Sequence, residues 1–206
     1  MTWMITNSGR EHHLAGTCQQ LNAPTIEEIA HALAQITRFT GHAKRPYSVA
    51  EHSLLVAYIA AGEGATPVQQ LAALLHDAHE AYVGDLASPA KWAIGQPWET
   101  FEHGQEVAVH NALGIRSTMV AHRASIKRWD LIALATERRD LLRYDPATSS
   151  PWRILDTPGH EVQPTEWRLA EGRSGTSWND WRMLFLEQYD LLKLRITSES
   201  KVLTHG

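Results

Sequence analysis

Four histidine and aspartate residues have side-chain types and positions in the sequence that could place them around one divalent metal ion. His76 and Asp77 are adjacent, His52 precedes them, and Asp130 follows inside an otherwise apolar stretch. Burying an unpaired carboxylate such as that of Asp130 costs free energy, and a nearby cation offsets this cost. Two imidazoles and two carboxylates suit a borderline or hard divalent ion such as Mn, Fe, Co, Ni or Zn. We therefore expect these four residues to hold one divalent transition metal.

Two further carboxylates follow the His-Asp pair. Glu80 comes four residues after His76, which on a continuous helix places both on one face. A general acid or base for a metal-bound water would be needed there. Asp85 comes shortly afterwards, where it could orient a water, a sugar hydroxyl or a leaving group. We expect Glu80 and Asp85 to be catalytic, and His79 to be a polar neighbour of the ligands.

Three capping boxes predict the helices that position these residues. Each has Ser or Thr followed three residues later by Glu or Gln, and the boxes start at Thr25, Ser48 and Thr66. The first predicts a helix with apolar positions up to Ile36, and the second a helix that carries His52. The third predicts a helix from Pro67 through Ala78 towards Gly84. On that helix His76 and Asp77 would be roughly 100° apart, close enough to share one ion.

The rest of the chain alternates helices with breaker-rich segments. Glycine, serine and proline predict a loop over residues 84–97, and a longer irregular connection over residues 144–175. Helices are predicted over residues 98–113, from 117 or 118 to 142 with a break near 125, and from 178 to about 195. The tail, residues 198–206, is expected to fray. Near the N-terminus, residues 3–6 pair at most as a short ribbon, and His12 and His13 are expected in an exposed loop.

No segment shows the sustained polar–apolar alternation of a strand, and the length fits one domain, so one all-α domain is expected. The 206 residues are 43% hydrophobic and 20% charged, with a net charge of −4. We expect a single domain over residues 1–206, with its core in residues 25–142 and a C-terminal extension in residues 143–206. The charge disfavours a nucleic-acid-coating surface, and no apolar run is long enough to cross a bilayer. A lone cysteine, Cys18, and no secretion signal favour the cytoplasm.

Two segments resemble a known family. The stretch from Arg38 to His52 (RFTGHAKRPYSVAEH) resembles the opening of the HD-domain nucleotide phosphohydrolases. HDAHE from His76, with GDLASPAK from Gly84, resembles their central motif. The likeness covers about residues 25–142 and is greatest to the branch of bacterial 5′-deoxynucleotidases and phage dATP triphosphohydrolases. It implies an HD-domain helical bundle with the metal on the same four residues, in a bacterial or phage-infected host cytosol.

The resemblance also implies the substrate contacts. Arg38 would hold a phosphate, with Lys91 and Lys127 as further phosphate-side cations. Lys127 precedes Asp130 by three residues, so both side chains leave one helix face. Phe39 would stack on the sugar or base. Gly41 and Pro89 would flank the base, and the room left by Gly41 keeps guanine a possible substrate. Lys44 and Arg45 are candidates for steering charges at the mouth.

The implied reaction is hydrolysis of a deoxynucleotide phosphoester. The leading prediction is a triphosphohydrolase of dNTPs, dATP included, which releases deoxynucleoside and triphosphate and uses additional Mg or Mn with the triphosphate. One alternative is a 5′-deoxynucleotidase acting on dNMPs. Another is a phosphodiesterase of cyclic or signalling nucleotides, for which His103 and His110 could be ligands of a second metal ion. A non-catalytic nucleotide sensor is the last alternative. The relatives associate, so a homo-oligomer is expected.

Overall fold

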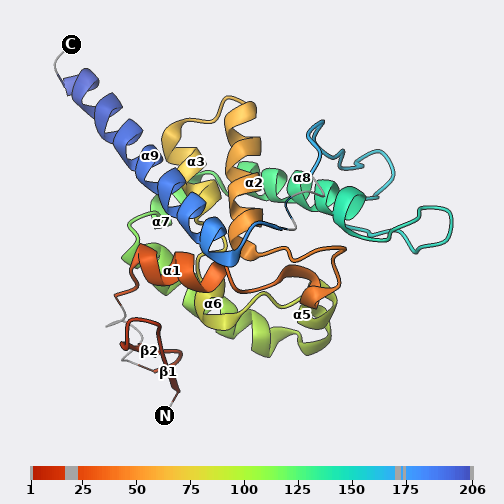
Figure 1. Cartoon of the computed structure of the whole chain (residues 1–206), viewed down its shortest axis with the longest axis horizontal. Coiled ribbons are helices and arrows are strands. Elements are labelled where there is room, and N and C mark those ends of the chain that lie inside the picture. Colours follow the sequence, from red (N-terminus) through yellow and green to blue (C-terminus); the bar gives the residue numbers. More distant parts are fainter. Residues whose placement is uncertain (1, 17–22, 170–172, 174, 205–206) are drawn as a thin grey trace.

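The computed structural model describes residues 2–16, 23–169, 173 and 175–204, and over these residues the fold is all-α with one small ribbon (Figure 1). The ribbon pairs β1 (Trp3–Ile5) with β2 (Glu11–His13) in antiparallel fashion, with Met4 opposite His12. The helices are α1 (Ile26–Leu33), η2 (Arg38–Gly41), α2 (Val49–Gly62), α3 (Pro67–Leu74), α4 (Glu80–Val83), α5 (Ser88–Ile94), α6 (Gln96–Ala112), α7 (Arg116–Ala121), α8 (Arg123–Leu141) and α9 (Trp178–Thr204).

The predicted caps start the helices at the expected residues. The hydroxyls of Thr25, Ser48 and Thr66 each accept a hydrogen bond from the backbone N–H three residues further on, at the starts of α1, α2 and α3. Thr66 forms the reciprocal capping box with Gln69. Ser177 accepts from the N–H of Asp180 at the start of α9. These side chains satisfy N–H groups that have no partner within the helix.

Helix α2 lies at the centre of the molecule. It packs against α3, α8 and α9, and it crosses the middle of the view in Figure 1. Eleven of its residues are buried, and they lie all around its axis, as expected for a helix surrounded by others. One apolar cluster joins α2 to α1, α3 and α9, and a second joins it to α3 and α8. The segments that carry His52 and Asp130 are therefore held together by the core.

The structure corrects several predicted boundaries. Residues 84–97 were expected to be a loop, but α5 forms there, because Pro89 suits a first helical turn and Gly95 (φ 69°) ends the helix. Helix α1 ends at Leu33 rather than near Ile36. The break between α7 and α8 falls at His122, slightly before the predicted position.

The final helix is also longer than predicted. Helix α9 continues to Thr204, whereas the sequence suggested an end near Arg195 and a frayed tail. The hydroxyls of Thr197 and Ser198 donate to carbonyl oxygens four residues earlier. These polar residues therefore continue the helix, and Figure 1 shows its C-terminal part extending beyond the other helices.

His12 and His13 were also expected in an exposed loop, but both lie in β2, where His12 is fully buried and His13 is half-buried. The ring of His12 stacks on Tyr82, with the ring centroids 3.6 Å apart. Its Nε2 is 2.9 Å from Oε1 of Gln105. The ribbon is thus attached to α4 and α6, which flank the candidate site. The predicted irregular connection is present over the described residues from 144 to 169, and among the described helices none is both long and apolar enough to cross a membrane.

Candidate metal centre

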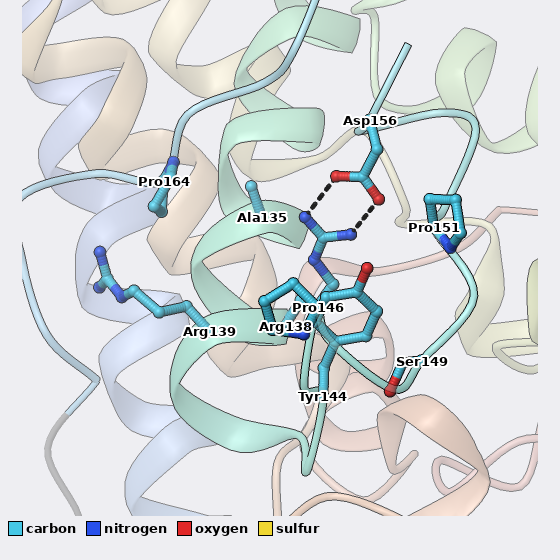
Figure 2. A pocket seen from close by; sticks show the side chains of 9 residues that line it. All are labelled: Ala135, Arg138, Arg139, Tyr144, Pro146, Ser149, Pro151, Asp156 and Pro164. Carbon is cyan, nitrogen blue, oxygen red and sulfur yellow. Dashed lines mark hydrogen bonds and ion pairs between the residues drawn. The ribbon is translucent and has the colours of Figure 1, made fainter. Parts of the chain in front are cut away.

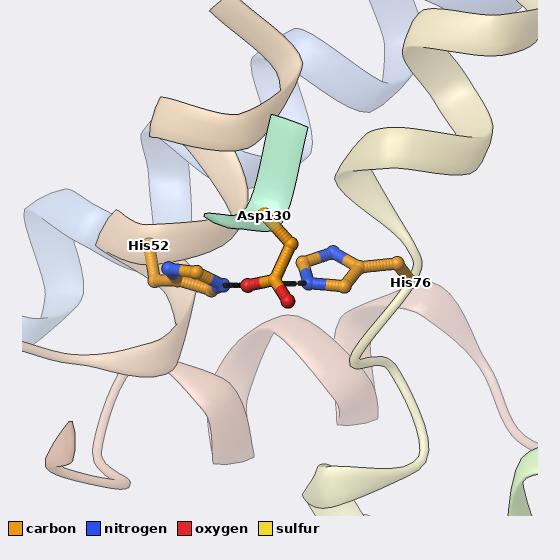
Figure 3. A group of neighbouring side chains, drawn as sticks. All are labelled: His52, His76 and Asp130. Carbon is orange, nitrogen blue, oxygen red and sulfur yellow. Dashed lines mark hydrogen bonds and ion pairs between the residues drawn. The ribbon is translucent and has the colours of Figure 1, made fainter. Parts of the chain in front are cut away.

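The four predicted metal ligands lie close together, and three of them, His52, His76 and Asp130, offer ligand atoms that are all within 4.8 Å of one another. Nε2 of His52 lies 3.3 Å from Nε2 of His76, 3.5 Å from Oδ2 of Asp77 and 3.4 Å from Oδ1 of Asp130. Nε2 of His76 lies 3.1 Å from Oδ2 of Asp77 and 4.0 Å from Oδ1 of Asp130. Figure 3 shows the two rings on either side of the Asp130 carboxylate. Two imidazole nitrogens and two carboxylate oxygens at these separations fit a borderline divalent cation.

Burial and charge make these groups strong candidate ligands. His52 is fully buried, and the Asp77 and Asp130 side chains are each 19% exposed. Burial by itself raises the pKa of Asp130. Hydrogen bonding to His52 and the charge of Lys127 outweigh that effect, and its pKa stays well below the ordinary value. Both aspartates therefore remain ionised, as metal binding requires.

His76 and Asp77 do not lie on a continuous helix, contrary to the prediction. Helix α3 ends at Leu74, and residues 75–79 form consecutive turns before α4. Nδ1 of His76 donates to the carbonyl oxygen of Ala73 at 2.8 Å, which is the acceptor that the N–H of Asp77 would use in an α-helix. Beyond this break, Nε2 of His76 and Oδ2 of Asp77 lie 3.1 Å apart, so the two neighbouring side chains face the same place.

The same break changes the interpretation of Glu80. Its N–H bonds to the carbonyl of Asp77, and it is the first residue of α4 rather than part of a helix shared with His76. Burial, together with the charges of Asp77 and Asp85, raises the pKa of Glu80 well above its ordinary value. Among the described residues, its Oε2 has no hydrogen-bond partner. Glu80 is thus a buried carboxyl beside the predicted ligands, and its surroundings favour the protonated form.

Arg38 lies among carboxylates at the same site. Its Nη2 donates to Oε2 of Glu137 at 3.2 Å. Its Nη1 lies 3.9 Å from Oδ2 of Asp77 and 3.8 Å from Oδ2 of Asp85. Burial would lower the pKa of Arg38, but the surrounding carboxylates raise it well above the usual value. This guanidinium and Asp85 therefore lie beside the predicted metal ligands, and their roles in binding phosphate and orienting a water stay predictions.

The segment after Arg38 has an unusual backbone. Phe39 (φ 56°) and Thr40 (φ 53°) are left-handed, which costs free energy for residues other than glycine. Phe39 is half-buried against the core, and the Arg38 guanidinium lies 5.5 Å from the centroid of its ring. Gly41 (φ 80°) is exposed, and a Cβ there would meet no atom within 4 Å. Its backbone conformation, rather than lack of space, accounts for this glycine.

The two predicted lysine cations are each paired with a carboxylate, whereas Pro89 is exposed. Nζ of Lys127 lies 2.7 Å from Oδ2 of Asp130, as their spacing predicted. Nζ of Lys91 lies 2.6 Å from Oε1 of Glu102 and 4.0 Å from Oε1 of Glu80. Pro89 is exposed in the first turn of α5.

The two candidate steering charges are engaged in structural contacts. Arg45 is buried and forms two hydrogen bonds to the carboxylate of Glu51, so it is not a steering charge at the surface. Lys44 donates to the backbone carbonyl of Asp140.

Two histidines considered for a second metal have other partners. His103 is exposed and its Nδ1 lies 3.0 Å from Glu106. His110 is buried, with its Nε2 directed at the backbone carbonyl of His76. A second group of possible ligands does exist, formed by His79, Glu80 and Glu102. The ammonium of Lys91 already balances the charge of that group.

Glu137 is the residue that the sequence analysis missed. Its side chain is fully buried on α8, with Oε1 at 2.5 Å from Nδ1 of His52 and 2.8 Å from the hydroxyl of Tyr47. One signal was available: Glu137 follows Asp130 by seven residues, two helical turns, so it lies on the same face of α8.

A separate cavity of about 530 Å³ lies between α8 and the irregular segment that follows it (Figure 2). Arg138 crosses it and makes two hydrogen bonds to Asp156, of 2.6 and 2.7 Å. Proline residues line much of the remaining wall. None of the predicted site residues lines this cavity, and the ion pair attaches the irregular segment to α8.

Comparison with known proteins gives two bacterial relatives. An uncharacterized protein of Rhodobacter capsulatus is 36% identical over 138 residues, which are 65% of this chain and 69% of the relative. The uncharacterized protein YfdR of Escherichia coli is 36% identical over 131 residues, 64% of this chain and 67% of the relative. No family model matches the chain.

Proposed function

The chain belongs to the same family as these two bacterial proteins, and we propose that it is a metal-dependent phosphohydrolase of 2′-deoxynucleotides. The names of the relatives state no activity, so the proposal depends on the site. One observation carries it: two histidines and two aspartates from separate segments converge, with a largely buried arginine and the buried carboxyl of Glu80 beside them.

The proposed metal is one divalent transition ion (Co, Mn, Zn, Ni or Fe), held by His52, His76, Asp77 and Asp130. Such an ion, when bound, polarises a phosphoryl oxygen and acidifies a coordinated water. Each of the four side chains offers a ligand atom at the point of convergence. The HD-domain resemblance assigns the same four residues.

The chain's own groups would then act on the phosphate. Nη1 of Arg38, which faces Asp77 and Asp85, would bind a phosphate oxygen and balance the charge that builds up during cleavage. Burial raises the pKa of Glu80 well above its ordinary value, which favours the protonated form that a general acid for the departing oxygen needs. Asp85 lies close enough to Arg38 to orient it or a water molecule.

The proposed substrate is a dNTP such as dATP, cleaved by water into deoxynucleoside and triphosphate. The nucleoside part of this proposal comes from the resemblance, with Phe39 as the stacking residue. In the part of the chain that the structure describes, Arg38, Lys91 and Lys127 are the cations in contact with site carboxylates, and all three are already paired. A triphosphate would therefore need Mg or Mn of its own, and a dNMP is the alternative with less charge to balance.

Product analysis tests the proposal directly. Metal-free protein would be reloaded with Co or Mn and incubated with dNTPs, dNMPs and cyclic nucleotides, and the products would be separated by ion exchange. We expect triphosphate from dATP, whereas inorganic phosphate from dNMPs alone would favour the nucleotidase. No turnover of any nucleotide would contradict an enzymatic role and would favour the alternative of a non-catalytic nucleotide sensor.

A pair of aspartate variants tests the metal assignment. Asp77→Ala should lose both bound metal and turnover, because it removes one of the converging carboxylates. Asp156→Asn is the matched control, because Asp156 pairs with Arg138 at the separate cavity. The control should keep both metal and activity.

A further inference from the structure

The carboxylate of Glu137 connects the two halves of the candidate site. Its Oε1 lies 2.5 Å from Nδ1 of His52, a predicted metal ligand. Its Oε2 lies 3.2 Å from Nη2 of Arg38, the predicted phosphate cation. The hydroxyl of Tyr47 donates to Oε1 at 2.8 Å. Glu137 is fully buried, so none of these contacts is weakened by exchange with water.

The contact with His52 determines which ring nitrogen can bind a metal. Oε1 of Glu137 accepts a hydrogen bond from the Tyr47 hydroxyl and Oε2 accepts one from Arg38, so both carboxylate oxygens act as acceptors. Nδ1 of His52, 2.5 Å from Oε1, is then the donor. Nε2 is left as the ring nitrogen that faces Asp77 and Asp130, and it is the one that would bind a metal. Carboxylates that orient histidines in this way commonly strengthen metal binding.

The contact with Arg38 determines which edge of the guanidinium faces the site. Nη2 is held by Glu137, whereas Nη1 is directed at Asp77 and Asp85. A guanidinium that is charge-paired on one edge keeps a fixed orientation, which reduces the entropy lost when the other edge binds phosphate.

We propose that Glu137 is a positioning residue that sets both the metal affinity of the site, through His52, and its phosphate affinity, through Arg38. The proposal builds on the proposed function, since it assumes that these two side chains meet a metal and a phosphate. It adds a residue on α8 that would contact neither the metal nor the phosphate. It predicts that one substitution weakens the binding of both.

Glu137→Gln is the test variant, because it keeps the shape and removes the charge. Its single amide oxygen can accept from His52, but the amide NH₂ then faces the Arg38 guanidinium, donor against donor. Titration of metal-free protein with Co²⁺, followed by visible absorption or chelator competition, should show affinity lowered about 10- to 100-fold. Tyr47→Phe, which removes only one bond to the same carboxylate, should lower it far less. Glu28→Gln, a buried carboxylate on α1 that pairs with Arg10, is the matched control and should not change it.

A spectroscopic measurement separates positioning from general destabilisation. In ¹¹³Cd-loaded wild-type protein with ¹⁵N-labelled histidine, the metal should couple to Nε2 of His52 and not to Nδ1. Coupling to Nδ1 would overturn the proposal. So would a Glu137→Gln variant that binds Co²⁺ as tightly as the wild type does.

Kinetic measurements complete the test and separate the role of Glu137 from the proposed hydrolysis of nucleotides. At saturating metal, Glu137→Gln should raise KM for the nucleotide about tenfold, with a smaller change in kcat, because Arg38 is no longer anchored. An unchanged KM would remove the phosphate half of the proposal. If the wild type binds metal but hydrolyses no nucleotide, the proposed function fails, whereas the Co²⁺ and ¹¹³Cd measurements still decide the role of Glu137.

Discussion

Nε2 of His110 lies 3.3 Å from the backbone carbonyl oxygen of His76, and this contact joins α6 to the turn that carries two of the four converging side chains. Burial lowers the pKa of His110 to about 4, so its ring is neutral at neutral pH and carries one N–H. Because α3 ends before His76, this carbonyl lacks the helical partner it would otherwise have. We infer that His110 replaces that partner.

Replacing His110 should therefore affect the site from a distance. His110→Ala should lower the free energy of unfolding by about 1–3 kcal/mol, because a buried carbonyl loses its donor, and should also weaken Co²⁺ binding. His110→Gln, which keeps an N–H donor, should retain more of both. Urea denaturation and Co²⁺ titration measure the two effects. Equal metal affinity in all three proteins would show that the contact does not hold the turn.

Glu80→Gln should keep the metal and lose rate. The side chain lies beside the ligands rather than among them, so bound metal should match the wild type, while kcat falls about 10²- to 10⁴-fold. Because burial raises the pKa of Glu80 above its ordinary value, the wild-type rate should fall as pH rises through that raised pKa, and the variant should lack this alkaline decrease. A wild-type pH–rate profile in the variant would exclude Glu80 as the acid.

The pH dependence of stability should reflect Glu28. Its carboxylate accepts from Arg10 at 2.5 Å and from Thr6 at 2.8 Å, which attaches the N-terminal ribbon to α1. Burial opposes ionisation, but these bonds lower the pKa of Glu28 from 4.5 to about 2. The unfolded chain takes up this proton first, so the stabilisation is complete above pH 4.5 and is lost as pH falls towards 2. Its size is at most about 3.5 kcal/mol, from a shift of about 2.5 pKa units at roughly 1.4 kcal/mol per unit.

The comparison is between wild type and Glu28→Gln in denaturant titrations from pH 7 down to pH 3. The difference in the free energy of unfolding should be constant near neutral pH and shrink on acidification. A difference that does not vary with pH would mean that the charge of Glu28 is not what stabilises the ribbon.

Gly41→Ala distinguishes backbone strain from room for a base. At φ 80°, alanine should cost about 1–2 kcal/mol of stability, although its Cβ would meet no neighbour within 4 Å. The preference among nucleotide bases should not change. Gly175→Ala is the control, because Gly175 lacks a positive φ and a Cβ there also meets nothing. If Gly41→Ala instead lost activity on nucleotides of one base and kept its stability, Gly41 would have the steric role that the resemblance implied.

Local sequence signals predicted much of the fold. The boxes at Thr25, Ser48 and Thr66 place the starts of three helices because each uses only neighbouring residues. The convergence of His52, the His76-Asp77 pair and Asp130 was also predicted, from residue types and the family resemblance. Whether they bind metal, and whether the protein forms a homo-oligomer in the cytoplasm, stay predictions; light scattering of the purified protein would test the oligomer.

What the sequence did not predict depends on contacts between distant segments. The end of α3 before His76 involves a side chain bonded to Ala73 and a partner on α6, whereas the apolar pattern favoured a continuing helix. Glu137 was not singled out because its partners, His52 and Arg38, are remote in sequence. His12 looked exposed because its surroundings are polar, yet it is buried against Tyr82.

The candidate ligands come from α2, the turn after α3, and α8, so their meeting point exists only while those three segments remain packed together. The site therefore reports on tertiary order. A partly unfolded form that keeps its helices but lets α8 move away from α2 would lose Asp130 and Glu137 in one step. Inactivation by mild heat or low denaturant should then precede the loss of helical signal, and a tightly bound ligand at this point should make the whole molecule harder to unfold.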